Sequence, residues 1–152
     1  MNSKDETIQL KLSKAKAILS EIEVLKINKF YSSVVDRLYF SCFHATHALL
    51  LTKDLMPKTH IGTSTTLHKY FVNAGLLKKE QAISFNNLMR ERMEDLHNDS
   101  KILDEAEVIG FIEPAKQYVE YISKLIQTYF DDQITNAGEN KIKNQLTHVS
   151  NY

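Results

Sequence analysis

The sequence predicts an all-α protein, built as a single-domain helical bundle of about five helices. The chain has 152 residues but only four glycines and two prolines. Long stretches repeat their apolar residues every three or four positions, which is the spacing of an amphipathic helix. A chain of this length can bury one substantial core. We therefore expect one bundle over residues 1–130, followed by a polar tail over residues 131–152.

Two helices are predicted in the first third of the chain. In the first, over residues 5–26, apolar residues form one stripe, and lysines and glutamates fill the opposite face. The second, over residues 30–53, is apolar almost all round, so we expect it at the centre of the bundle. It contains Cys42, the only cysteine, which suits packing in a reducing compartment and excludes an intramolecular disulfide.

The middle of the chain is predicted as a connector and a short helix. Residues 55–62 include Pro57 and are typical of a connector. A helix over residues 63–74 would then end at Gly75, because glycine is the favoured residue just after a helix.

The last two predicted helices cover residues 78–97 and 104–130, with a polar break at residues 98–100. Asp104 and Glu107 have the spacing of a capping box, which marks the start of the final helix. Pro114 lies inside that helix and would clash with the carbonyl of Gly110, so we expect a kink there.

Composition limits the function classes. The 19 basic and 19 acidic residues cancel, so the chain has no overall attraction for nucleic acid or membrane, and any polyanion must be held by a local patch. The first ten residues are polar and mixed in charge, and no apolar run approaches the ~20 residues that a membrane span needs. These features predict a cytoplasmic protein without a membrane segment.

Several short motifs follow one another in a familiar order. They are RLYFSCFHA at residues 37–45, KTHIG at residues 58–62, and Phe71-Val72 followed by Gly75. Their order and spacing resemble the higher-eukaryote-and-prokaryote nucleotide-binding (HEPN) domain, in the bacterial branch often paired with minimal nucleotidyltransferases. The resemblance continues through Asp95 to about Leu125, although this chain has Leu96 where that branch usually has a tyrosine.

The resemblance implies a bundle with a four-helix up-and-down core, usually a homodimer. Many members are metal-independent ribonucleases or toxins, and their catalytic motif is an arginine, four to six residues, and a histidine near the end of a late helix. Two registers fit here: Arg92 with four residues before His97, and Arg90 with six. Many members of this branch lack the full motif, so a catalytic protein and a non-catalytic module both stay open.

Helical phase separates the two arginines. The apolar stripe of this helix consists of Phe85, Leu88, Met89, Met93 and Leu96. Arg92 falls within that stripe, whereas Arg90 and His97 lie close together in angle at its edge, about 10 Å apart along the axis. A neutral His97 could take the proton from a ribose 2′-hydroxyl, while Arg90 or Arg92 stabilises charge on the phosphoryl oxygens. A structural reading also fits, because helix C-termini favour basic residues.

Three further residues are candidate substrate-binding groups: Arg37, His60 and Asn98. Arg37 lies in an apolar helix and needs a partner or a ligand, and His60 could contact a phosphate or fix its loop. His44 and His47 are three residues apart, but no third ligand stands at a familiar spacing, so no metal is expected. No cofactor is expected either, since the four glycines form no phosphate-binding loop.

The sequence therefore predicts a metal-independent endoribonuclease of the toxin or defence type, with RNA as substrate and a homodimer as its form. The second hypothesis is a non-catalytic module that binds a nucleotidyltransferase-type antitoxin or a nucleotide. A third is a helical interaction protein that uses an exposed face of the first helix.

Overall fold

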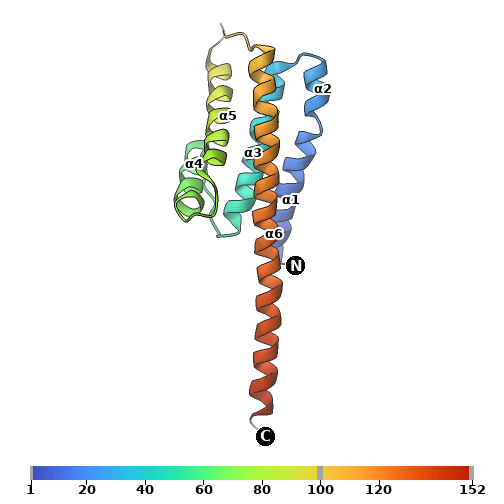
Figure 1. The fold of residues 1–152 in the computed structure, drawn as a ribbon, viewed down its shortest axis with the longest axis vertical. Coiled ribbons are helices and arrows are strands. Elements are labelled where there is room, and N and C mark those ends of the chain that lie inside the picture. Colours follow the sequence, from blue (N-terminus) through green and yellow to red (C-terminus); the bar gives the residue numbers. More distant parts are fainter. Residues whose placement is uncertain (1, 99–100, 151–152) are drawn as a thin grey trace.

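The protein is an all-α bundle, as the sequence predicts. The computed structural model describes residues 2–98 and 101–150, and this part of the chain contains helices and no strand. The helices are α1 (Ser3–Leu19), α2 (Ile22–Ile27), α3 (Tyr31–Leu51), α4 (His60–Leu67), α5 (Lys79–His97) and α6 (Glu105–Val149), arranged as in Figure 1. A π-helical turn, His68–Val72, continues α4.

Helix α3 lies at the centre, which confirms the expectation for the apolar stretch around residues 30–53. Eleven of its 21 residues are buried, and it packs against α1, α2, α4, α5 and α6. Its buried polar groups are paired: Ser41 donates to the carbonyl of Ala15 at 2.7 Å, and the hydroxyls of Thr46 and Tyr118 lie 2.6 Å apart. These bonds join α3 to α1 and α6. Cys42 is buried, and burial raises the pKa of its thiol.

The single helix predicted over residues 5–26 is wrong, because the structure divides it into α1 and α2. Ser20 caps the end of α1, and its hydroxyl donates to the carbonyl of Ala17 at 2.5 Å. Such a local bond competes with continued helix formation. Glu21, the next residue, turns toward Arg37 of α3 and accepts two hydrogen bonds from it, at 2.9 and 3.2 Å.

The short middle helix begins earlier than predicted. Thr59 caps α4, its hydroxyl accepting a bond from the backbone N–H of Gly62 at 2.9 Å, so residues 60–62 belong to the helix and not to the connector. The expected stop is present: Gly75 has φ +75°, a conformation that glycine adopts without a side-chain clash. Just after it, the N–H of Leu76 donates to the carbonyl of Phe71 at 2.8 Å.

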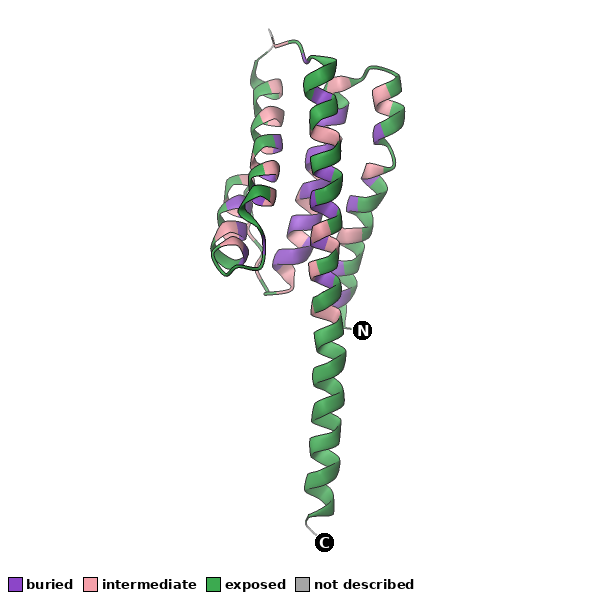
Figure 2. Ribbon diagram, viewed as in Figure 1, coloured by how far each residue is buried: buried purple, intermediate pink, exposed green. Residues whose placement is uncertain are grey.

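Helix α6 starts where the capping signal predicts but extends much further. Asp104 caps it by accepting a bond from the N–H of Ala106 at 3.2 Å. The helix passes through Pro114 without ending, and it does not stop near residue 130 but runs to Val149. The part beyond Phe130 is exposed throughout residues 131–150 and projects from the bundle as a single rod (Figure 2). We call this part, residues 131–149, the α6 extension.

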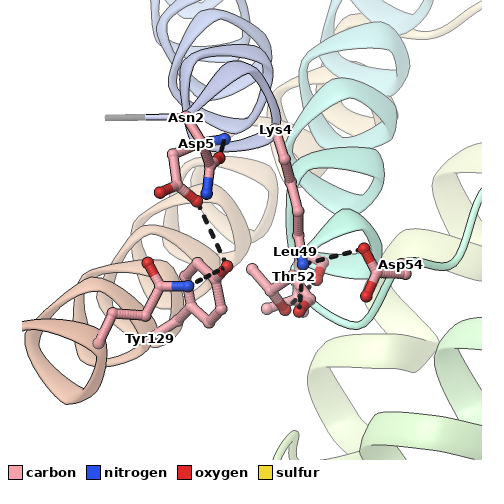
Figure 3. A network of polar contacts seen from close by, with 8 residues as sticks. Asn2, Lys4, Asp5, Leu49, Thr52, Asp54 and Tyr129 are labelled. Atoms are coloured by element: carbon pink, nitrogen blue, oxygen red, sulfur yellow. Dashed lines mark hydrogen bonds and ion pairs between the residues drawn. The ribbon is translucent and has the colours of Figure 1, made fainter. Parts of the chain in front are cut away.

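Polar contacts fasten the end of the bundle from which the extension emerges (Figure 3). Lys4 contacts Asp54 at 3.0 Å and the carbonyl of Thr52 at 3.3 Å, which ties α1 to the end of α3. The hydroxyl of Tyr129 donates to Asp5 at 3.3 Å, which ties α6 to α1. The base of the extension is therefore fixed. Within the described residues, no helix is long and apolar enough to cross a membrane.

Candidate functional site

Arg92 of α5 is engaged in structural contacts. Its Nε lies 2.9 Å from Oδ1 of Asp36 on α3, and only 17% of its side chain is exposed. Its guanidinium also lies over two aromatic rings of α3, at 5.1 Å from the centroid of Tyr39 and 4.7 Å from that of Phe40. A guanidinium held by a carboxylate and two ring faces fastens α5 to α3.

The other charged residues around Arg92 are also paired. Glu91 and Glu94 contact Lys101 at 2.6 and 3.0 Å, and these carboxylates raise the pKa of that lysine. Asp95 accepts a hydrogen bond from Ser32 at 3.2 Å. A single lysine thus faces two of the three carboxylates in this half of α5, and a neutral hydroxyl donates to the third.

Arg90 differs from these neighbours because it faces outward. It is exposed, and within residues 2–98 and 101–150 it forms neither an ion pair nor a hydrogen bond. It borders an open groove of about 740 Å³ between α4 and α5. The polar groups along this groove are Thr59, His60, Ser64, Thr65, Asn86 and Arg90. The available guanidinium therefore sits at the edge of a surface depression that is large enough for a small ligand.

His60 enters the same groove from the start of α4. Its Nδ1 is hydrogen-bonded to the hydroxyl of Tyr39, and its ring lies 4.9 Å from that of Phe43. Burial raises the pKa of Tyr39 to about 12, so at neutral pH the phenol keeps its proton and can donate to His60. With the phenol as donor, a neutral His60 ring carries its proton on Nε2. His60 is thus both fixed in its loop and part of the groove lining, so the two readings of this residue are compatible.

His97 is the last residue of α5 and is exposed, but it does not line the groove. It follows Arg90 by seven positions, so the two side chains differ by about 20° around the helix and by about 10 Å along it. Met93 and Leu96, between them, are 42% and 55% exposed. Asn98 caps the helix, its N–H donating to the carbonyl of Glu94 at 2.9 Å.

The structure places Arg37 away from this groove. Its contacts with Glu21 supply the partner that an arginine in an apolar helix requires, and its role in substrate binding stays a prediction. His47 is hydrogen-bonded to Thr63 at 3.0 Å, and burial, followed by nearby positive charges, lowers its pKa to about 4. No group of three or more His, Cys, Asp or Glu side chains suited to a metal ion occurs in the described part of the chain.

The grouping of His60 with Arg90 was not predicted from the sequence. The two residues come from different helices, and only the packing of α4 beside α5 brings them to one groove. Tyr39 belongs to the apolar helix expected at the centre of the bundle, and it is buried, but its hydroxyl also positions His60. The sequence singled out the two residues separately, His60 in the motif at residues 58–62 and Arg90 by its spacing from His97.

Comparison with known proteins settles the family. The HEPN domain family matches residues 8–133 of the chain. The chain belongs to the HEPN family. This HEPN protein is 28% identical to the UPF0332 protein of Thermotoga maritima over 127 residues, which cover 84% of this chain and 96% of that relative.

Two relatives from Methanocaldococcus jannaschii are named as candidate toxins. The first is 35% identical over 123 residues, covering 80% of this HEPN chain and 90% of the relative. The second is 38% identical over 69 residues, covering 45% of this chain and 47% of the relative. The resemblance stated from the motifs alone is confirmed.

Proposed function

We propose that this HEPN protein is a toxin-type endoribonuclease that needs no metal ion, with Arg90 and His97 as its reacting pair. The observation that carries the proposal is the contrast along α5: Arg92 is held by Asp36, whereas Arg90 and His97 are exposed on nearly the same side of the helix. The toxin names of two relatives support the same role.

The chemistry asked of these residues is a transesterification. Neutral His97 takes the proton from a ribose 2′-hydroxyl, and the oxygen attacks the neighbouring phosphorus. Arg90 stabilises the negative charge that builds on the phosphoryl oxygens. The bond to the 5′-oxygen then breaks and that oxygen takes a proton from water, while the proton held by His97 passes to the hydroxide that remains. The products end in a 2′,3′-cyclic phosphate and a 5′-hydroxyl.

The groove beside Arg90 supplies a place for the RNA strand. Met89, Met93 and Ile61 form apolar walls that suit a base or ribose, and His60 lines the same groove as a polar group for a phosphoryl oxygen. Along α5 the groove is lined from Asn86 to Met93, and His97 lies just beyond it. An RNA strand that follows α5 from the groove would therefore contact the binding groups first and the general base, His97, after them.

A homodimer around α5 would complete the site. About 10 Å along the axis separates Arg90 from His97 within one chain, which is too far for both to act on one phosphate without movement. If two copies of α5 pair in opposite directions about Met93, Arg90 of one copy lies beside His97 of the other. The exposed side chains of Met93 and Leu96 provide apolar surface for this contact.

The test uses purified full-length protein, single-stranded RNA and EDTA. We expect cleavage that leaves 2′,3′-cyclic phosphate ends, and loss of that cleavage in His97→Ala with an unchanged melting temperature, because His97 is exposed. His148→Ala, an exposed histidine in the α6 extension, is the matched control and should cleave normally. Intact RNA with the wild-type protein across several substrates would overturn the proposal.

The second candidate function is a non-catalytic HEPN module that binds a nucleotidyltransferase-type antitoxin or a nucleotide. Ile61 favours it, because this groove residue is 75% exposed and an apolar side chain so placed suits a protein partner. If the RNA stays intact, Ile61→Asp should then weaken binding of the co-expressed partner while leaving the fold unchanged.

A further inference from the structure

The α6 extension is the largest feature of the molecule that the proposed function leaves unused. Residues 131–150 are all exposed, and Figure 2 shows no other element beside this rod. The HEPN match ends at residue 133, so nearly all of the extension lies outside the shared domain. The extension has no contacts to hold it helical beyond the helix that it continues, and its interior glycine, Gly138, lowers its helix propensity. A helix of this kind gains stability mainly from packing against a partner.

One face of the extension is apolar. Ile134, Ile142, Leu146 and Val149 are 73%, 58%, 65% and 74% exposed. At about 100° per residue, these four side chains and Gly138 fall within an arc of roughly 120°. Nothing lies within 4 Å of the position that a Cβ on Gly138 would take, so contacts within the chain do not explain the missing side chain.

The charges of the extension are divided along its length. Residues 131–140 carry Asp131, Asp132 and Glu139 and no basic residue, whereas residues 141–150 carry Lys141, Lys143 and His148 and no acidic residue. Two such helices side by side in the same direction would place like charges together. In opposite directions, the acidic half of each would face the basic half of the other.

We propose that the α6 extension pairs in antiparallel fashion with the same segment of a second copy of this chain. One register aligns the apolar faces and sets each charged half beside the oppositely charged half. With Ile134 opposite Leu146 of the other copy, Gly138 lies opposite Ile142, so a small residue meets a large one. The acidic half of each copy then lies level with the basic half of the other, and on one flank Glu139 comes near Lys143 of the other copy. The apolar face supplies the affinity, and the charges set the direction.

The base of the extension is shaped for the tip of the other helix. A hollow of about 440 Å³ is lined by Asp5 and Gln9 of α1 together with Phe130, Ile134 and Ala137 of α6. In the proposed register, Val149 of the second copy reaches the level of Asp131, beside this hollow. The extension leaves the bundle at the end opposite the C-terminus of α5, so this contact is separate from the proposed ribonuclease site (Figure 1).

Disulfide trapping tests both pairing and direction in the full-length chain. The double variant Asp131→Cys/Val149→Cys, at the centre of the apolar arc, should form a covalent dimer under mild oxidation on a non-reducing gel. Each single variant should not, because equivalent positions of an antiparallel pair are separated by roughly 27 Å along the axis. Cys42 is buried, so we expect it to form no disulfide-linked dimer of its own in this experiment. Dimers from the single variants would show a parallel pair, and no dimer from the double variant would show no pair; either result overturns the proposal.

A second measurement checks the apolar face without new cysteines. Ile142→Asp should weaken self-association in sedimentation experiments by roughly tenfold or more, because it places a charge in the contact. Asn144→Asp adds the same charge on the opposite face of the same turn and should change little. Both positions are exposed, so neither change disturbs the bundle. Equal effects of the two substitutions would contradict the assigned face.

Discussion

Arg90 and Arg92 are separated by one residue on α5, yet their side chains point about 200° apart around the helix. The sequence predicted this division, since the apolar stripe assigns Arg92 to the packed side and leaves Arg90 outside it. The sequence could not identify the residue that pairs with Arg92. Asp36 is 56 residues away along the chain, and only the crossing of α3 and α5 brings its carboxylate to Arg92.

We expect Arg92→Ala to lower the free energy of unfolding by about 1 to 3 kcal/mol. The change removes a partly buried ion pair and two ring contacts, and it leaves Asp36 without its cation. Urea unfolding at pH 7 measures the effect. Arg90→Ala is the matched control and should stay within about 0.5 kcal/mol of the wild type, because that side chain is exposed. Equal losses in the two variants would contradict the assignment.

His47 predicts how stability depends on pH. The pKa of His47 is lowered from its ordinary value of 6.5 to about 4, mainly by burial. Between these values the unfolded chain binds a proton that the folded chain does not bind, so stability falls as pH decreases from 6.5 to 4. Above pH 6.5, His47 is neutral in both the folded and the unfolded chain. Its full contribution to the free energy of unfolding is then present.

The variant His47→Gln should therefore lose less stability than the wild type between pH 7 and pH 4, by about 2 kcal/mol after allowing for the partial exposure of the ring. Thermal or urea unfolding over this pH range gives the comparison. His148→Gln removes an exposed histidine and should follow the wild-type profile. A profile for His47→Gln that parallels the wild type would show that another group causes the loss.

Among the helices, α3 and the start of α6 were predictable because their signals are local. An apolar surface on every side predicts burial, and Asp104 followed by Glu107 predicts a helix start. The break between α1 and α2 was not predictable, because the contact of Glu21 with Arg37 depends on how α3 packs beside it. The polar composition beyond Phe130 indicated little core, which agrees with its exposure, but it hid the continuation of the helix to Val149.

The central position of α3 can be tested with one substitution. Leu38 is fully buried, so Leu38→Ala should reduce the free energy of unfolding by roughly 2 to 5 kcal/mol through lost burial and the cavity it leaves. Leu10→Ala makes the same chemical change on α1 at a side chain that is 70% exposed, and it should cost less than about 0.5 kcal/mol. A small loss at Leu38 would mean that α3 is not the packed centre.

The assembled molecule has two separate surfaces proposed for contact with a second copy: the face of α5 around Met93 and the α6 extension. Because each contact is symmetric, a chain that uses both should form assemblies larger than a dimer at tens of micromolar. Sedimentation should show that Met93→Lys and Ile142→Asp each reduce the assembly to a dimer and that the double variant is a monomer. A monomeric wild-type protein would contradict both contacts.

The candidate site was only partly predictable for a reason that concerns the whole bundle. The candidate residues were identified in the sequence, but their grouping depends on how α4 packs beside α5. His60 shares a groove with Arg90, while Arg37 lies with Glu21 outside it. Helical phase on α5 could be calculated from spacing, whereas contacts between distant segments could not.

The most direct test of the proposed function compares RNA cleavage rates of Arg90→Ala and Arg92→Ala in EDTA, well below the melting temperature of each variant. Arg90→Ala should lose roughly 100-fold or more in rate, as expected when a charge-stabilising group is removed from a reaction centre. Arg92→Ala should stay within about tenfold of the wild type, because its contacts are structural. A larger loss in Arg92→Ala than in Arg90→Ala, at equal folded fraction, would contradict the assignment of Arg90 as the reacting arginine.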